Sequence, residues 1–174
     1  MSKRIYTIGH STRELSELVA LLRENGVTRL ADIRRFPGSR RHPHFSREAL
    51  QESLPENGIT YVHFEDLGGR RKALADSPNT ALRNEQFRAY ADHMATPAFH
   101  AAVDRLVESD QVTAYMCAEA VPWRCHRNLL SDELVRRGLE VVHIIGGRSQ
   151  PKHDLSEYAV VAGDHVEYPG VFRT

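Results

Sequence analysis

The most reactive side chains of this 174-residue chain gather in one short stretch, YMCAEAVPWRCHR, at positions 115–127. The stretch holds both cysteines and the only tryptophan. Cys117 should end a strand, whereas Cys125 and His126 should lie in the first turn of the helix that follows, counted from Pro122. Free N–H groups and the helix dipole at such a position bind anions and lower a thiol pKa, which favours the reactive thiolate. We therefore expect Cys117 or Cys125 to act as a nucleophile or redox thiol.

Other interpretations of the same residues stay open. Cys117, Cys125 and His126 offer two sulfurs and a nitrogen to a transition metal, with Glu119 or His10 as a fourth ligand. The C-x7-C-H spacing is not that of a zinc knuckle, however, and the sequence requires no cofactor. Alternatively, both cysteines are simply buried, as free cysteines often are. In the catalytic interpretation, Glu119 moves protons.

A second cluster, DIRRFPGSR at 32–40, combines a carboxylate with several basic residues. Arg34 lies two residues after Asp32, so in an extended chain both side chains point to one face. A turn at the Pro-Gly pair lets Arg40 fold back as a second arm of an anion clamp, because guanidinium groups bind phosphate or carboxylate through paired hydrogen bonds. Arg127 is the third candidate arm. The alternative is an Asp–Arg pair on the surface, which contributes little energy.

The third cluster, GHS at 9–11, follows the first predicted strand. Gly9 permits a tight exit from that strand. The ordinary pKa of histidine suits His10 to proton transfer, a role for which Asp32 is also a candidate. Ser11 and Glu14 form the S-x-x-E pattern of a capping box, so Ser11 should cap a helix and not act as a nucleophile.

Strands and helices alternate along the chain and must position these clusters. Apolar residues at helical spacing follow Ser11 and Ser46, and they recur in three later segments. Those segments are 87–94, a helix opened by Thr96 and Pro97, and a helix from Pro122 to about Arg137. The predicted strands cover 4–8, 28–33, 59–64, 112–116 and 139–145, with an exposed loop at 67–80 and a hairpin turning at Gly163-Asp164 in the tail.

This alternation predicts an α/β fold, a single three-layer domain whose mostly parallel sheet is flanked by helices, Rossmann-like or flavodoxin-like. The domain should span residues 1–153, with 154–174 as a C-terminal tail or hairpin packed on it. Right-handed crossovers place the carboxyl ends of all strands along one edge, where open α/β sheets bind ligands. Because each reactive cluster follows a strand, we expect the clusters to share one cleft.

Composition narrows the class of protein. The net charge is zero, with 41% hydrophobic and 26% charged residues, which is ordinary for a globular protein. No apolar run is long enough to span a membrane, and nothing resembles a secretory signal, so we expect a cytoplasmic protein with reduced thiols. Residues 1–72 nevertheless carry 13 Lys and Arg against 9 Asp and Glu, and the stretch 34–47 has five arginines and no acid. Such a basic patch attracts phosphates.

Taken together, these motifs resemble the domain of unknown function family numbered 488. The matches run in order from residue 7 to about 153 and are specific only jointly. They are TIGHS (7–11), DIRRFPGSR (32–40), PHF (43–45), GITYVH (58–63), LGG (67–69), FRAYADHM (87–94), MCAE (116–119), CHR (125–127) and VHI (142–144). The resemblance implies a compact α/β protein and supplies no established reaction. It implies a site drawn from His10, Asp32, Arg34, Ser39, Arg40, Cys117, Glu119, Cys125, His126 and Arg127.

The resulting hypothesis is a thiol- or carboxylate-dependent enzyme that binds an anionic, phosphate-bearing substrate, such as a nucleotide or nucleic acid. Cys117, Cys125, Glu119, His10 and Asp32 are the catalytic candidates. Arg34, Ser39, Arg40, His126 and Arg127 are the substrate-binding candidates. One alternative is a nucleic-acid-binding accessory module without catalysis, which uses the 34–47 loop and RRK at 70–72. The other is a protein that binds metal through Cys, His and Glu ligands.

Overall fold

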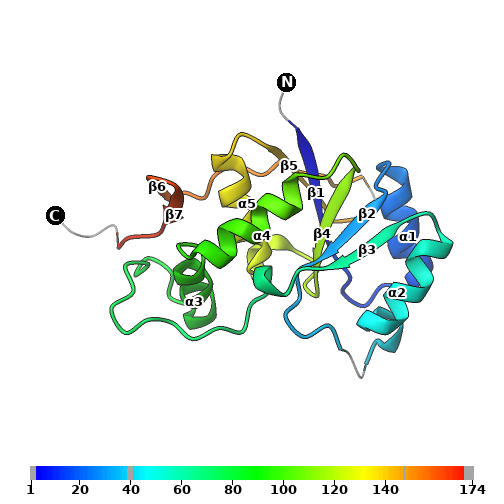
Figure 1. The fold of residues 1–174 in the computed structure, drawn as a ribbon, viewed down its shortest axis with the longest axis horizontal. Helices are drawn as coiled ribbons and strands as arrows, with labels where there is room; N and C mark the ends of the chain where they lie inside the picture. The colour runs from blue at the N-terminus through cyan, green and yellow to red at the C-terminus, as the bar shows by residue number, and fades with distance from the viewer. Residues whose placement is uncertain (1–2, 39–40, 147, 171–174) are drawn as a thin grey trace.

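A five-stranded sheet runs through the centre of the computed structural model, which describes residues 3–38, 41–146 and 148–170 (Figure 1). The strand order is β3-β2-β4-β1-β5, and every neighbouring pair is parallel. The parallel α/β sheet predicted from the alternation of elements is therefore confirmed. The strands are β1 (Arg4–Gly9), β2 (Arg29–Asp32), β3 (Thr60–His63), β4 (Thr113–Cys117) and β5 (Glu140–Ile144).

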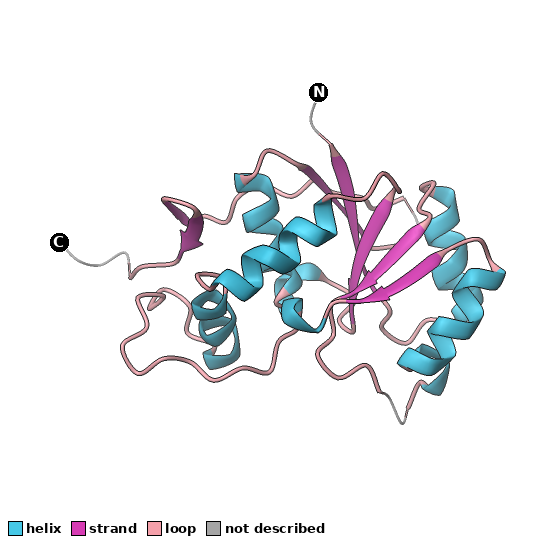
Figure 2. Ribbon diagram, viewed as in Figure 1, coloured by secondary structure: helices cyan, strands magenta, loops and turns pink. Residues whose placement is uncertain are grey.

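Helices cover both faces of this sheet and complete the three layers (Figures 1 and 2). On one face Leu22 and Leu50 belong to an apolar core with Met116 of β4, and on the other Phe99 and Leu130 belong to a second core. The first face carries α1 (Leu15–Glu24) and α2 (Arg47–Glu56); the second carries α3 (Glu85–His93), α4 (Pro97–Val107) and α5 (Arg127–Arg136).

The three layers are those of the predicted Rossmann-like or flavodoxin-like architecture, and the strands follow an order of their own. A Rossmann sheet runs 3-2-1-4-5-6 and a flavodoxin sheet 2-1-3-4-5. Here β4 lies between β1 and β2, so these two early strands are not neighbours. As a consequence the end of β4, at Cys117, lies between the end of β1, at Gly9, and that of β2, at Asp32.

Helix starts follow the capping signals in most places. Ser46 accepts a hydrogen bond from the Ala49 N–H at 3.2 Å, and Thr96 accepts one from the Phe99 N–H at 3.3 Å. The predicted Ser11 cap is wrong, because α1 begins at Leu15 with Glu14 at the N-cap position and no side-chain cap bond. Three 3-10 turns connect the larger elements: η1 (Pro43–Phe45), η2 (Glu65–Leu67) and η3 (Pro122–Arg124).

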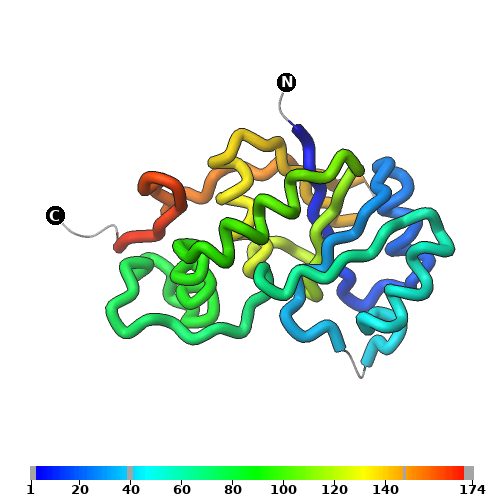
Figure 3. The backbone as a smooth tube through the Cα atoms, viewed as in Figure 1, coloured from blue at the N-terminus to red at the C-terminus, as the bar shows by residue number. Residues whose placement is uncertain are grey.

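Two irregular regions flank the α3–α5 face. The stretch from η2 to α3 contains no helix or strand, as predicted for 67–80, and runs as a long loop (Figure 3). The buried Asp92 ties it down by accepting hydrogen bonds from the Leu74 N–H, Ser77 and Asn79. The tail forms the predicted hairpin, with β6 (Val160–Ala162) and β7 (His165–Glu167) antiparallel around Gly163-Asp164. No helix in the described part of the chain is both long and apolar enough to cross a bilayer.

Candidate active site

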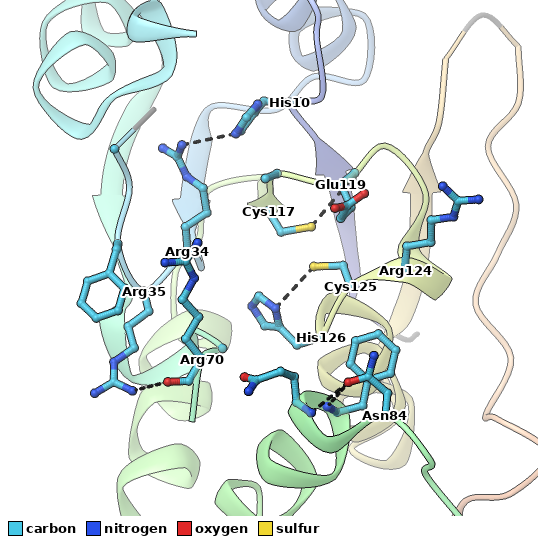
Figure 4. Close-up of a pocket in the computed structure, with 16 residues that line it drawn as sticks. His10, Arg34, Arg35, Arg70, Asn84, Cys117, Glu119, Arg124, Cys125 and His126 are labelled. Atoms are coloured by element: carbon cyan, nitrogen blue, oxygen red, sulfur yellow. Dashed lines mark hydrogen bonds between the residues drawn. The ribbon is translucent and has the colours of Figure 1, made fainter. Parts of the chain in front are cut away.

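One pocket of about 490 Å³ lies where β1, β2 and β4 end (Figure 4). His10 follows β1, Arg34 follows β2, and Cys117 ends β4, so the strand order brings the three clusters together as expected. Six of the candidate residues line it: His10, Arg34, Cys117, Glu119, Cys125 and His126.

Gly9 allows the two strand exits to approach one another. A Cβ atom at this position would lie 1.6 Å from the carbonyl oxygen of Glu119, so no other residue fits without moving the backbone. The His10 N–H donates to the Cys117 carbonyl at 3.0 Å, and the Ser11 N–H donates to the Ala118 carbonyl at 2.9 Å. Ser11 has a φ of 49°, a left-handed conformation that is uncommon outside glycine. The GHS motif is therefore a backbone junction as much as a source of side chains.

Asp32 holds Arg34 in place but does not line the pocket. The fully buried carboxylate accepts from Arg34 Nε at 2.9 Å and from its terminal nitrogen at 2.7 Å, and it also accepts from the Tyr61 hydroxyl at 2.5 Å. Burial and the Asp32 charge raise the pKa of Tyr61 well above its usual range. Arg34 is thus a guanidinium with a fixed orientation, and Asp32 is a positioning residue with no free lone pair directed at a ligand.

The imidazole of His10 is engaged at both nitrogens. Its Nδ1 lies 3.0 Å from the Ser11 carbonyl and its Nε2 lies 3.3 Å from a terminal nitrogen of Arg34. Because Arg34 can only donate, Nε2 must accept, and Nδ1 carries the proton that Ser11 receives. Burial lowers the pKa of His10 to about 4. His10 is therefore neutral near pH 7 and braces Arg34.

The two cysteines are free, buried thiols whose sulfur atoms point toward one another (Figure 4). Burial opposes ionisation of Cys117, but the hydrogen bond from Cys125 and the charge of Arg127 outweigh it and lower the pKa of Cys117. Burial and the neighbouring Cys117 raise the pKa of Cys125. Cys117 is therefore the more easily ionised thiol of the pair.

Arg127 lies beneath the pocket wall and not in it. Its terminal nitrogens donate to Thr7 Oγ1 at 2.9 Å and to the carbonyls of Glu119 and Ala120 at 3.0 and 3.3 Å. Among the described residues no carboxylate pairs with this fully buried guanidinium, and its Nε has no hydrogen-bond partner. Cys117 Sγ contacts the same Glu119 carbonyl at 3.8 Å. A buried positive charge without an acidic partner thus lies beside the thiol. The sequence had predicted Arg127 instead as an arm of the anion clamp.

A chain of hydrogen bonds leads from Arg127 to the C-terminal segment. Thr7 Oγ1 lies 2.7 Å from His143 Nδ1, and His143 Nε2 lies 2.9 Å from His153 Nδ1. His153 Nε2 lies 2.7 Å from the buried carboxylate of Asp132, which the Tyr168 hydroxyl also reaches at 2.6 Å. Burial lowers the pKa of His143 to about 3, so this ring is neutral near pH 7. The Asp132 carboxylate can only accept, so His153 Nε2 donates to it.

The helix expected from Pro122 is interrupted at Cys125. Pro122–Arg124 forms the 3-10 turn η3, Cys125 is extended, and α5 begins only at Arg127. Cys125 Sγ consequently accepts from the N–H of Arg127, the first residue of α5, at 3.4 Å. The N-terminus of α5 does contact a thiol, as predicted. Cys125 precedes the helix, however, and does not lie in its first turn.

His126 connects Cys125 to β2. Its Nε2 lies 3.0 Å from the Ile33 carbonyl and must donate, which leaves Nδ1 without a proton, 3.4 Å from Cys125 Sγ. Burial lowers the pKa of His126 to about 4, so the ring is neutral and forms no ion pair with a thiol. His126 therefore lines the pocket as a neutral hydrogen-bond acceptor and not as a cation.

Several rim residues were not foreseen from the sequence. Arg35, Arg70 and Arg124 line the pocket with Arg34, and among the described residues of the wall only Glu119 is acidic. Phe36 is 59% exposed, and the guanidinium carbons of Arg35 and Arg70 lie 5.4 and 6.0 Å from its ring centre. The sequence predicted the RRK tripeptide at 70–72 as part of a basic surface. That prediction singled out Arg70 but did not place it at the pocket.

The candidates Ser39 and Arg40 lie outside the described residues. Within the described ranges, no group of three or more His, Cys, Asp or Glu side chains is arranged to hold a metal ion. The geometry therefore gives no support to the metal-binding alternative.

Comparison with known proteins gives one match. A family model described as "Domain of unknown function DUF488" matches residues 14–134. No curated protein and no solved structure matches the chain.

Proposed function

The chain belongs to the DUF488 family, whose description names no reaction, and from the geometry of the site we propose that it is a thiol-dependent enzyme acting on a small phosphate-bearing substrate. Cys117 is the nucleophile of this proposal. The carrying observation is the buried Arg127 guanidinium, which lies next to Cys117 without a carboxylate partner.

The buried charge of Arg127 requires compensation. A buried cation is costly unless an anion or several hydrogen bonds compensate it. Arg127 has three bonds to neutral oxygens, and its Nε has none. A thiolate on Cys117 supplies the missing negative charge, and thiolate is the nucleophilic form of cysteine. Purely structural packing needs no such charge, and it would be satisfied by an apolar side chain in place of Arg127.

The pocket wall supports an anionic substrate. Among its described lining residues are four arginines and one carboxylate, that of Glu119. The arginines are Arg34, Arg35, Arg70 and Arg124. Arg34 is held by two hydrogen bonds to Asp32 and therefore loses little side-chain entropy when it binds an anion. Glu119 is exposed and adjacent to Cys117, so in this proposal it accepts the proton of an incoming water or hydroxyl.

The experiment measures thiolate formation and access together. Ultraviolet thiolate absorbance is titrated against pH for the native chain, Cys117→Ala and Cys125→Ala, and alkylation by iodoacetamide is mapped by peptide mass spectrometry. We expect Cys117→Ala to remove a thiolate that titrates below the ordinary cysteine pKa of about 8.5. Inorganic phosphate should slow alkylation of Cys117.

Arg127→Lys and Arg127→Met form the matched pair for this experiment. The lysine keeps the charge and should keep the low pKa, whereas the methionine should raise it. If Cys117→Ala leaves the low titration unchanged and phosphate gives no protection, the thiol is a packing residue and the proposal is wrong.

The second candidate function is nucleic-acid binding without catalysis. The exposed Phe36 beside two arginines favours it, because exposed aromatic rings and guanidinium groups together bind single-stranded nucleic acid. Its signature is an oligonucleotide affinity that falls steeply with salt and is unchanged in Cys117→Ala.

A further inference from the structure

A second cavity shares a wall with the first. It measures about 200 Å³ and is lined by Leu82, Phe87, Trp123, Cys125, Asn128, Leu129, Ser156, Tyr158 and Tyr168. Phe87 and Cys125 line both cavities. The buried Cys125 thus separates an arginine-rich chamber from one that contains four aromatic side chains.

The C-terminal segment builds one side of this aromatic chamber. The Ser156 N–H donates to Asp132 at 3.0 Å, and the Tyr168 hydroxyl and N–H donate to Asp132 at 2.6 Å and to Asn79 at 2.8 Å. These bonds fix the wall before any ligand arrives. Residues 14–134 match the family model, so Ser156, Tyr158 and Tyr168 come from outside the matched part of the chain.

Two large side chains at the chamber remain open to solvent. Trp123 is 61% exposed and Tyr158 is 48% exposed, although Tyr168 beside them is almost completely buried. Exposed aromatic side chains around a concave surface are typical of a binding site. The chamber is smaller than the roughly 300–1,000 Å³ of a pocket that encloses a whole drug-sized ligand. Its size therefore suits one ring system, with the remainder of the ligand outside it.

From these observations we propose that the two chambers bind one substrate, an aromatic monophosphate of nucleotide type. Its phosphate lies among the arginines of the larger chamber, and its ring stacks against Trp123 and Tyr158 in the smaller one. This inference rests on the proposed function and adds the class of substrate to it. The reacting bond then lies near Cys117 and Cys125, between the phosphate and the ring.

The only tryptophan of the chain reports directly on the smaller chamber. The probes are adenosine 5′-monophosphate, ribose 5-phosphate and adenosine. Each is titrated against the full chain, and two signals are followed: the fluorescence of Trp123 and the protection of Cys117 from alkylation. We expect the nucleotide to change the fluorescence and to protect Cys117. Ribose 5-phosphate should protect Cys117 more weakly and leave the fluorescence unchanged.

Tyr158→Ala removes one wall, and Tyr158→Phe keeps the ring as the matched control. We expect the alanine variant to bind the nucleotide about tenfold more weakly, which is the order of one lost aromatic stacking contact, and to bind ribose 5-phosphate as the native chain does. The phenylalanine variant should bind both like the native chain.

The outcomes separate the two proposals. Equal affinity for nucleotide and ribose 5-phosphate, with no effect of Tyr158→Ala, would overturn the aromatic chamber and leave the proposed function in place. If neither phosphate compound protects Cys117 from alkylation, the proposed function is overturned, and this inference with it. A dinucleotide that binds at least tenfold more tightly than the mononucleotide would overturn the assignment to a monophosphate and favour nucleic acid.

Discussion

His143 Nε2 and His153 Nδ1 lie 2.9 Å apart, and this contact joins the last strand of the sheet to the segment that follows it. His143 is bonded through Thr7 to Arg127, and His153 is bonded to Asp132. The charge beside Cys117 is therefore connected to a carboxylate through two imidazole rings, and replacement of one ring should change the pKa of the Cys117 thiol.

His143→Gln should raise the pKa of Cys117. The glutamine cannot bond to both Thr7 and His153 with the geometry of an imidazole, so the Thr7 hydroxyl that accepts from Arg127 is no longer held in position. Thiolate absorbance against pH should show the shift, by several tenths of a unit or more toward the ordinary cysteine value. His165→Gln in the hairpin is the control, because the described hydrogen-bond partners of His165 are Asp164 and Glu167 of its own hairpin. An unchanged titration in His143→Gln would show that Arg127 is oriented by the Glu119 and Ala120 carbonyls alone.

Acid should destabilise the fold through three buried histidines. Burial lowers the pKa of His10 and His126 to about 4 and that of His143 to about 3. The unfolded chain therefore takes up protons on these histidines near pH 6.5, whereas the folded chain takes them up only near pH 4 or below. The free energy of unfolding is therefore highest above pH 6.5 and decreases as the pH falls toward 4. At pH 5 each histidine contributes a loss of about 2 kcal/mol as an order of magnitude.

Urea unfolding at pH 7.5 and pH 5.0 measures this loss. His10→Gln and His126→Gln should each show a smaller difference between the two pH values than the native chain shows. The same free energy of unfolding at both pH values would mean that these rings are protonated in the folded protein.

Period-two alternation could be predicted from the sequence, and it places the thiol correctly. Tyr115 and Cys117 of β4 point to the α3–α5 face, whereas Ala114 and Met116 point to the α1–α2 face. The general rule that parallel strands end at one edge then brought His10 and the thiol into one pocket.

Long-range pairings could not be predicted in this way. A sequence shows that Arg127 is basic but not that it is buried against Thr7, since the two are 120 positions apart. Nor could the sequence show the break before α5, because Pro122 is a good first residue for either an α-helix or a 3-10 turn. Asp32, predicted as a proton carrier, is occupied by Arg34 and Tyr61 for the same reason.

Gly9→Ala should unfold the site or the protein. The added Cβ would lie 1.6 Å from the Glu119 carbonyl oxygen, which is backbone and also accepts from Arg127. We expect a loss of about 4 kcal/mol or more in the free energy of unfolding, in the range of the most severe single substitutions. Gly38→Ala is the matched control, because nothing lies within 4 Å of its Cβ position, and it should change stability by less than about 0.5 kcal/mol. Similar thermal melting of both variants would contradict the close approach of the two strand exits.

Asp32→Asn tests whether Arg34 is a prepared ligand of anions or merely one half of an ion pair. The asparagine removes the counter-ion of the buried guanidinium and leaves the Phe45 carbonyl at 2.7 Å and His10 Nε2 at 3.3 Å as its other acceptors, so the free energy of unfolding should fall by about 3 kcal/mol. Freed from its fixed orientation, Arg34 should also bind phosphate more weakly, which calorimetry or protection of Cys117 measures at a temperature where the variant remains folded. Tyr61→Phe removes one bond to the same carboxylate and keeps the ion pair, and it should retain native phosphate affinity. If Asp32→Asn binds phosphate as tightly as the native chain, the orientation of Arg34 contributes nothing to the pocket, and Arg35, Arg70 and Arg124 hold the anion by charge alone.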